Sequence, residues 1–303
     1  MFLNSSIYLA PLQSFTTVPY CMAFAKVVGG VDKYFTPFYR ADRAGNFSLE
    51  KYLLSRPHLN IVPQVLSNRA GELVLFTHLM LERGFDEVNL NLGCPFPMVV
   101  KRRLGAGLLP YPKDVDQMLS LFFQKKIPVR LSVKLRLGLH DVNEVTAVLD
   151  VLKQYPLAEV IMHPRLGVQR YKGNPDWDAF AQLSKDYHLV ANGDIITARG
   201  LEAMQQRFTD VQAWMIGRGL LMNPCMLKVD LDWKDCVNKL HDLFLDYLRE
   251  FGFSEPQILN QLKCFWEYPS KFREGGSRVF RKMKKVGHFD DYQVLKNRLL
   301  DLE

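Results

Sequence analysis

Residues 87–109, EVNLNLGCPFPMVVKRRLGAGLL, contain the pattern that decides the fold. The first six residues place an apolar side chain at every second position, which is the pattern of a β-strand. Gly93, Cys94 and Pro95 end this pattern, so the predicted strand carries the Cys94 thiol at its carboxyl end. In a (β/α)8 barrel, that end of each strand faces the active site. A free cysteine is more often a small buried apolar residue, and for Cys94 considered alone this alternative stays open.

Short apolar segments alternate with helix-like segments along most of the chain. Strands are predicted at 7–10, 33–38, 60–66, 87–92, 129–137, 159–164, 189–193 and 213–217. Helices are predicted between them, for example at 69–83, 114–125, 142–154, 176–186 and 197–207. This order predicts an α/β fold, a (β/α)8 TIM barrel. A doubly wound open sheet shows the same alternation, but no G-x-G-x-x-G motif follows the first strand.

The alternation stops after residue 228. Amphipathic helices are predicted beyond it at 233–252, 256–268, 271–286 and 289–302, with glycine and proline turn signals between them. We therefore predict a barrel domain at 1–228 and a small, all-helical C-terminal domain at 229–303.

One face of the predicted helix 271–286 is basic. Arg278, Arg281, Lys282 and Lys285 follow the spacing i, i+3, i+4 and i+7, which places them on one side of a helix. The formal net charge of the chain is +7, which permits a polyanionic partner without requiring one. The alternative is an ordinary solvated helix face.

Composition and cysteine usage exclude several classes of protein. The chain is 48% hydrophobic and 23% charged, as in ordinary globular proteins, and it has no apolar run as long as a membrane span. Its five cysteines are odd in number and form no C-x-x-C pair, which argues against a disulfide framework and a zinc site. The N-terminus lacks the basic segment of a signal peptide. We expect a cytoplasmic monomer that binds neither a membrane nor a metal.

Polar side chains interrupt the predicted apolar strands at three places. Gln64 and Lys134 need polar partners if they are buried, and a buried lysine is costly unless an anion or a polar ring meets its ammonium group. His163 ends a predicted strand and is followed by Arg165. A single histidine is more often structural, but its place at this end of a strand favours a site role.

The last two predicted strands end in motifs that are typical of phosphate binding. Asn192, Gly193 and Asp194 follow one strand, and Gly217 and Arg218 follow the next. Loops after the seventh and eighth strands of such barrels often hold a phosphate group. Glycine would let backbone N–H groups approach the phosphate, and arginine would supply charge.

The motif NLNLGCP followed by GAGLL resembles the signature of the tRNA-dihydrouridine synthase family, which runs Asn-x-Gly-Cys-Pro and then Gly-Ala-x-Leu-Leu. At least five further stretches match that family in order, among them AP near residue 10, VKLRLG, HPR, NGD and GRG. The chain departs from the family pattern at Leu12, Ser14, Thr17 and Leu166.

The resemblance implies an enzyme that reduces one uridine of tRNA to 5,6-dihydrouridine with FMN as cofactor and NADPH as reductant. Hydride would pass from N5 of reduced FMN to uracil C6, and the Cys94 thiol would donate a proton to C5. FMN contacts are expected from Ala10, Pro11, Leu12, Gln64, Lys134, His163, Asn192, Gly193, Asp194, Gly217 and Arg218. Substrate contacts are expected from Asn91 and Arg165 at the base, from the loop cations Lys101, Arg102 and Arg103, and from the basic helix face.

Two other functions remain open at this point. A reductase of a small pyrimidine or enone would share the barrel and the FMN site, but it would not need the basic helix face. A tRNA-binding protein with a decayed flavin site would fit the departures at Leu12, Ser14, Thr17 and Leu166.

Overall fold

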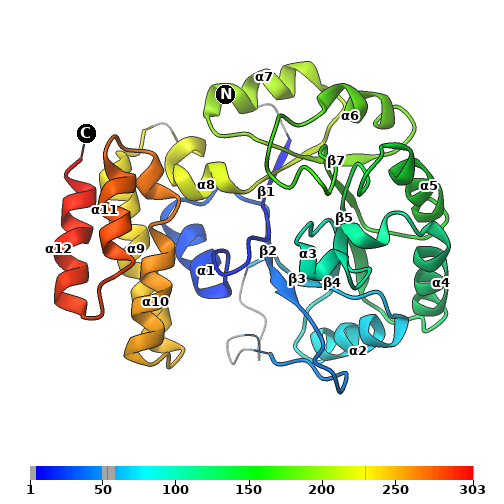
Figure 1. Ribbon diagram of the computed structural model, residues 1–303, viewed down its shortest axis with the longest axis horizontal. Helices are drawn as coiled ribbons and strands as arrows, with labels where there is room; N and C mark the ends of the chain where they lie inside the picture. Colours follow the sequence, from blue (N-terminus) through cyan, green and yellow to red (C-terminus); the bar gives the residue numbers. More distant parts are fainter. Residues whose placement is uncertain (1–4, 50–52, 54–58, 229, 303) are drawn as a thin grey trace.

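The computed structural model describes residues 5–49, 53, 59–228 and 230–302. Its centre is a closed barrel of eight parallel strands in chain order (Figure 1). The strands are β1 (Ser6–Leu9), β2 (Lys33–Tyr39), β3 (Ile61–Val65), β4 (Glu87–Leu92), β5 (Arg130–Arg136), β6 (Val160–His163), β7 (Leu189–Asn192) and β8 (Ala213–Ile216). Pairing of β1 with β8, in the register Ser6 to Ala213, closes the ring. The TIM barrel prediction is confirmed, and the open-sheet alternative is wrong.

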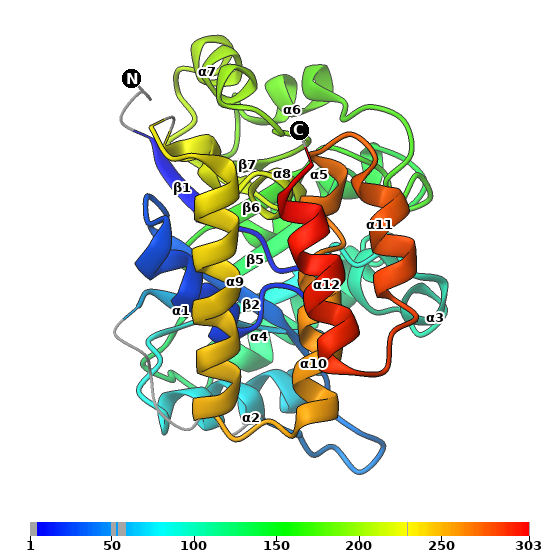
Figure 2. The ribbon, with the colours of Figure 1, turned by 90° about the vertical axis from the view of Figure 1, so that its left-hand side faces the viewer.

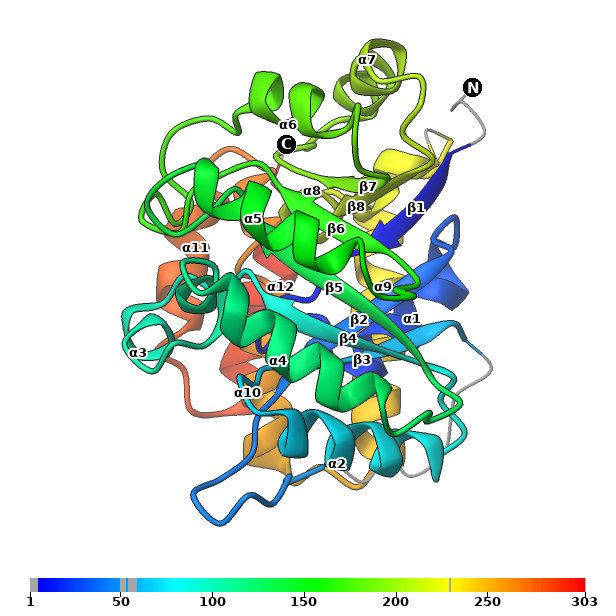
Figure 3. The same cartoon turned by 90° about the vertical axis from the view of Figure 1, so that its right-hand side faces the viewer.

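Helices cover the outer face of the barrel, and Figure 3 shows α2, α4 and α5 along it. The helices of the barrel region are α1 (Val18–Val27), α2 (Ala70–Leu81), α3 (Pro97–Val100), α4 (Pro112–Phe123), α5 (Asn143–Leu152), α6 (Trp177–Leu183), α7 (Ala198–Arg207) and α8 (Arg218–Met222). In α4, residues 115, 118, 119 and 122 are buried, which is the i, i+3, i+4, i+7 stripe of an amphipathic helix. The helices at α1, α3 and α8 were not among the predicted ones.

The middle of the barrel is a packed apolar plug. Eight buried residues from six of the strands or their ends form it: Tyr8, Ala10, Phe35, Val62, Ile161, Val190, Ala213 and Met215. Their positions alternate with residues that face the outer helices, as expected for strands buried on both sides. The plug separates two polar ends of the barrel.

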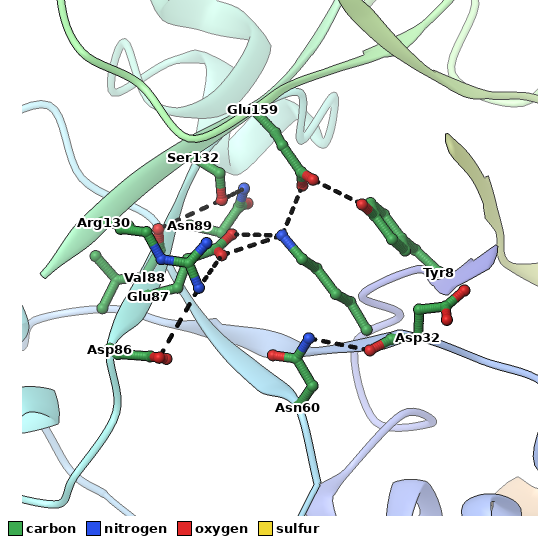
Figure 4. A network of polar contacts seen from close by, with 11 residues as sticks. Tyr8, Asp32, Asn60, Asp86, Glu87, Val88, Asn89, Arg130, Ser132 and Glu159 are labelled. Carbon is green, nitrogen blue, oxygen red and sulfur yellow. Dashed lines mark hydrogen bonds and ion pairs between the residues drawn. The ribbon is translucent and has the colours of Figure 1, made fainter. Parts of the chain in front are cut away.

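The amino end of the barrel contains a charge network (Figure 4). The Lys33 ammonium lies 3.1 Å from a carboxylate oxygen of Glu87 and 3.0 Å from one of Glu159. Arg130 pairs with Glu87 at 3.2 Å, and the Tyr8 hydroxyl donates to Glu159 at 2.6 Å. Every buried charge here therefore meets an opposite charge from the same chain.

The C-terminal segment folds as α9 (Trp233–Glu250), α10 (Glu255–Phe265), α11 (Gly276–Met283) and α12 (Phe289–Leu300), which stand side by side in Figure 2. Helix α9 contacts α1, and the rings of Tyr20 and Phe244 meet edge to face at 5.9 Å. The hydroxyl of Tyr292 joins His241 and Trp266 at 2.6 and 2.8 Å inside the bundle. The all-helical prediction is confirmed, whereas the division into domains at residue 228 stays a prediction.

One predicted boundary in this segment was wrong. The helix expected at 271–286 begins only at Gly276, because Gly275 adopts the left-handed φ of +73° and stops the backbone from continuing. Lys271 lies instead in the short 3-10 turn η4 (Pro269–Lys271). Three cations of the predicted basic face, Arg278, Arg281 and Lys282, lie on α11, whereas Lys285 lies in the turn after it, because the helix ends at Met283.

None of the helices in the described part of the chain combines the length and the hydrophobicity that a membrane span requires.

Candidate active site

A cavity at the carboxyl ends of the strands collects many of the residues that the sequence singled out. Its lining includes Pro11 and Leu12 after β1, Asn91 on β4, Cys94 in the following loop, Lys134 on β5 and His163 on β6. These residues are far apart in sequence, and closure of the barrel brings them to one mouth. Phe38, Phe96, Arg136 and Tyr171 complete most of the remaining wall.

A chain of side-chain hydrogen bonds runs across β3, β4 and β5 below this cavity. The Asn91 oxygen accepts from the backbone N–H groups of Gly93 and Cys94 at 3.0 and 2.9 Å. The Asn91 nitrogen must then donate, and it does so to Gln64 Oε1 at 2.7 Å. Gln64 Nε2 donates to Asn89 Oδ1 at 2.7 Å, and Asn89 Nδ2 donates to Ser132 Oγ at 2.9 Å.

This amide chain fixes the direction of every group in it. The amide oxygens of Gln64 and Asn91 both accept hydrogen bonds, so Asn91 has its remaining N–H to offer to the cavity. Gln64 is fully buried, whereas Asn91 lines the cavity. The arrangement holds the loop that starts at Gly93 in one conformation, and with it the Cys94 thiol.

Cys94 lies at the boundary between an apolar cluster and the cavity. It packs with Leu66, Val99 and Leu104, yet it also lines the cavity opposite Lys134. Its backbone is held tightly, because a Cβ on Gly105, whose φ is +56°, would come within 2.6 Å of the Cys94 carbonyl oxygen. Burial raises the pKa of the thiol, and a backbone hydrogen bond at Phe96 and the charges of Arg136 and Lys134 offset only part of that rise. Cys94 is therefore protonated at neutral pH.

Lys134 is a half-buried cation that makes no ion pair with any carboxylate in the described part of the chain. Desolvation, and after it the neighbouring charge of Arg136, lower its pKa to about 7. Arg136 itself donates to the carbonyl oxygens of Gly93, Leu166 and Arg170 at 3.0, 3.1 and 2.7 Å. The Arg136 guanidinium thus has hydrogen-bond acceptors, whereas the Lys134 ammonium has none among the described residues.

His163 and Arg165 continue this positive region beyond β6. Arg165 is 1% exposed and pairs with Asp194 after β7, which also pairs with Arg218 after β8. His163 Nε2 lies 3.1 Å from an Arg165 nitrogen. Burial and then the charges of Arg136, Lys134, Arg165 and Arg218 lower the pKa of His163 well below its usual value, so its ring is neutral. Burial raises the pKa of Asp194, but the hydrogen bond from Arg165 and the charge of Arg218 outweigh this and keep it low.

The glycine motifs after β7 and β8 have a packing role. A Cβ on Gly193 would approach the Trp177 ring to 2.2 Å, and one on Gly219 would approach the Ile195 carbonyl oxygen to 2.1 Å. Asn192 donates to the Met215 carbonyl at 2.7 Å, which ties the two strand ends together. Gly217 packs against Ala10 and Leu12, so the end of β8 adjoins the end of β1.

Two groups of exposed cations flank the mouth. Lys101, Arg102 and Arg103 follow α3, and all three side chains are exposed. The Arg103 guanidinium carbon lies 4.2 Å from the centre of the Tyr111 ring, and one guanidinium nitrogen lies 3.8 Å from a carboxylate oxygen of Asp114. The basic face of α11, made of residues 278, 281, 282 and 285, is also exposed, and α3 and α11 lie toward the same side of the molecule in Figures 2 and 3.

The aromatic part of the site was missed by sequence reasoning. Phe96 is 53% exposed and Tyr171 is 45% exposed, although both line the cavity. Arg136 and Arg218 lie over the Tyr171 ring at 5.4 and 4.8 Å. The signal for Phe96 was its place between two prolines directly after Cys94, since such a loop cannot bury a ring in a helix or sheet.

Comparison with known proteins gives a consistent result. The family model described as "Dihydrouridine synthase (Dus)" matches residues 42–298. The "Probable tRNA-dihydrouridine synthase 2" of Bacillus subtilis (strain 168) is 28% identical over 303 aligned residues, which cover 95% of this chain and 91% of that protein. The "tRNA-dihydrouridine synthase B" of Pasteurella multocida (strain Pm70) is 26% identical over 235 residues, which cover 75% of this chain and 69% of that protein.

Proposed function

Since the chain belongs to the dihydrouridine synthase family, we propose that it reduces a uridine of tRNA to 5,6-dihydrouridine, with FMN as cofactor and NADPH as reductant. The observation that supports this most directly is that one cavity is lined by both a protonated thiol, Cys94, and a half-buried cation that has no described partner, Lys134.

The charges around the mouth fit an anionic cofactor. Four cations, Lys134, Arg136, Arg165 and Arg218, lie close enough to His163 to lower its pKa, and Asp194 pairs with two of them, Arg165 and Arg218. An FMN bound here would supply the hydride for the pyrimidine ring and would accept electrons from NADPH. Lys134 would meet the electron-rich edge of its ring system, and Arg218 with the loops at 192–194 and 217–218 would meet its phosphate.

The size of the site sets a further requirement. The cavity has a volume of ≈ 80 Å³, which is small beside a three-ring cofactor. Tyr171 is an exposed part of the wall whose ring lies under the guanidinium groups of Arg136 and Arg218. We expect this side chain to move outward when the cofactor binds.

Cys94 is the proton donor in this proposal. Reduction of the 5,6 double bond adds a hydride at one carbon and a proton at the other. The raised pKa keeps the proton on the thiol at neutral pH, and solvent returns it after each turnover. The amide chain through Asn91 holds the Cys94 backbone, so the sulfur need not be positioned anew for each substrate.

The free N–H of Asn91 suits a carbonyl oxygen of uracil, because the Asn91 oxygen is already used by Gly93 and Cys94. A base must leave the stacked RNA to reach this depth. The exposed Phe96 ring at the rim offers a surface on which such a base can stack. The basic loop at 101–103 and the helical domain proposed at 229–303 would hold the RNA by its phosphates.

The function is tested with purified protein, an unmodified tRNA transcript and NADPH. We expect the protein to carry a bound flavin and to form dihydrouridine in the transcript, measured by mass spectrometry of the nucleosides. Reduction of free uridine or of a small enone with no change in the transcript would favour a small-molecule reductase. A protein that binds the transcript but never retains or reduces a flavin would instead be a non-catalytic RNA-binding protein.

A further inference from the structure

A second hollow lies outside the active site, on the rim of the barrel. It has a volume of ≈ 720 Å³ and is enclosed by the loop after β2, the start of α2 and the end of the loop that contains Cys94. Its charged lining consists of four arginines, Arg40, Arg43, Arg69 and Arg102, and two acidic residues, Asp42 and Glu72. The sequence had singled out only Arg102 among these.

The two acidic residues are engaged in local structure. Asp42 Oδ1 accepts from the backbone N–H groups of Ala44 and Asn46 at 2.8 and 2.9 Å, which closes a turn. Glu72 accepts from the Ser67 hydroxyl at 2.6 Å and lies 3.6 Å from Arg69.

The other three arginines of the hollow are exposed and unopposed. Arg40, Arg43 and Arg102 make no ion pair with a carboxylate that the structure describes. Arg40 and Arg43 lie in the loop after β2 and Arg102 lies in the loop after α3, and both loops line the hollow. A hollow of this composition favours an anionic ligand.

One layer of side chains separates the hollow from the loop that contains Cys94, here called the catalytic loop. Leu66 and Leu104 line it and also pack directly with Cys94 in one apolar cluster. Asn68, another lining residue, donates to the carbonyl oxygens of Arg102 and Arg103 at 3.1 and 3.2 Å, which ties the loop after β3 to the end of the catalytic loop. A ligand in the hollow would therefore be fixed relative to the thiol.

The lining chemistry points to a phosphate group of a polymer. Arginine binds phosphate through paired N–H groups and keeps its charge at any physiological pH. Among the described residues, the lining contains no aromatic side chain on which a nucleobase or a nicotinamide ring could stack. The loop after β2 also lies toward the same side of the molecule as α3 and α11, as Figures 2 and 3 show from opposite directions.

We propose that Arg40, Arg43, Arg69 and Arg102 bind a backbone phosphate of the tRNA whose uridine enters the neighbouring mouth. The proposal rests on the proposed function, and it adds a contact on the rim of the barrel to those proposed for the helical segment. The RNA would then be held by the barrel rim as well as by the helical segment.

The test is the double variant Arg40→Ala/Arg43→Ala in the flavin-containing, full-length protein. Affinity for an unmodified tRNA transcript is measured by fluorescence anisotropy between about 50 and 200 mM KCl. We expect affinity at the lower salt to fall about tenfold, and the slope of log K against log salt to become shallower by about one to two units. Flavin absorbance and the melting temperature establish that the variant is folded.

The matched control is Lys125→Ala/Lys185→Ala. Both lysines are exposed and lie between a helix and the start of the next strand, at the amino end of the barrel. This pair removes the same charge, so its affinity and salt slope should stay at the wild-type values. Equal losses in the two double variants would overturn the site, because the effect would then be one of net charge.

Two other results would also overturn the proposal. The first is wild-type affinity and slope in the arginine variant. The second is a higher KM for NADPH, measured without tRNA, which would assign the hollow to the phosphate of the dinucleotide. Neither result bears on the proposed function, which dihydrouridine formation by the wild-type protein decides.

Discussion

The two polar ends of the barrel treat buried charge in opposite ways. At the amino end, Lys33 lies between Glu87 and Glu159, and Arg130 shares Glu87 (Figure 4). At the carboxyl end, the cations outnumber the carboxylates, and Lys134 has no partner among the described residues. A buried charge is costly unless an opposite charge accompanies it. The charges of the amino end are therefore balanced within the chain, whereas the carboxyl end keeps a cation that suits the anionic cofactor proposed above.

The contrast between the two ends of the barrel predicts that substitutions at one end affect stability and substitutions at the other end affect activity. Changes at the amino end should alter the free energy of unfolding with little effect on turnover by the folded enzyme. Changes at the carboxyl end should alter turnover or ligand affinity with little cost in stability.

The largest effect is expected for Cys94→Ala. Loss of the proton donor should lower the rate of dihydrouridine formation by about 10²- to 10⁴-fold, the usual contribution of general acid catalysis. Flavin content and tRNA affinity should be retained, since the backbone around residue 94 is held by Asn91 and not by the thiol. Single-turnover formation of dihydrouridine measures the rate, and a wild-type rate in the variant would refute the assignment of Cys94.

The next largest effect is expected for Glu87→Leu at the opposite end. This carboxylate is 1% exposed and faces both Lys33 and Arg130, so its removal takes one ion pair from each cation and leaves Lys33 with Glu159 and Arg130 with Asp86. The free energy of unfolding, measured in urea, should fall by about 3 kcal/mol. Activity per folded molecule should not change. Glu82→Gln, at an exposed carboxylate on the surface, should leave stability within about 0.5 kcal/mol of wild type.

The pH dependence of Lys134 tests the same contrast at the mouth. In the flavin-free folded protein its pKa is about 7, whereas in the unfolded chain it is near 10.4. The unfolded state thus holds more protons between these values, so this residue makes stability rise as the pH increases from about 7 to 9. Lys134→Met should remove that rise.

Urea unfolding of flavin-free wild type and Lys134→Met at both pH values isolates this contribution. The difference in stability between the two proteins should be larger at pH 7, with the variant the more stable. The same substitution should weaken FMN binding, measured by fluorescence titration. A variant that is less stable than wild type at pH 7 would show that the chain itself supplies a partner for the lysine.

The smallest effects are expected on the basic face of α11. Arg281→Ala should weaken tRNA binding a few-fold and reduce the slope of log K against log salt by about one unit, because one phosphate contact is lost. Stability should not change, since the side chain is exposed and makes no ion pair in the described part of the chain. An unchanged salt slope would identify this face as solvated surface.

The local pattern of the sequence predicted the barrel and part of its mouth correctly. Each strand was found within two residues of its predicted bounds, because strands buried on both faces appear as short apolar runs between turn residues. The thiol after β4 and the lysine in β5 could be placed at the mouth for the same reason. The helix boundary at 271 was wrong because amphipathic periodicity continued across Gly275, where the backbone turns.

Arg130 and Arg136 show where such reasoning stops. Both have the same parity in β5, so the alternation of the strand does not distinguish them. In the structure Arg130 is exposed at the amino end, and Arg136 is buried at the mouth with three carbonyl partners. Those partners come from loops after β4 and β6, which the sequence alone does not bring together.

The sequence by itself determined the barrel, the carboxyl-end position of Cys94 and the basic face of the last helices, because each depends on a spacing within one segment. Only the tertiary structure decided how the polar groups share their hydrogen bonds. The direction of the amide chain from Ser132 to Cys94 depends on three strands in register, and the arginine-lined hollow depends on three loops that meet when the ring of strands closes. Hydrogen bonds and charge balance are properties of distances in space, and distances between distant segments exist only after the chain has folded.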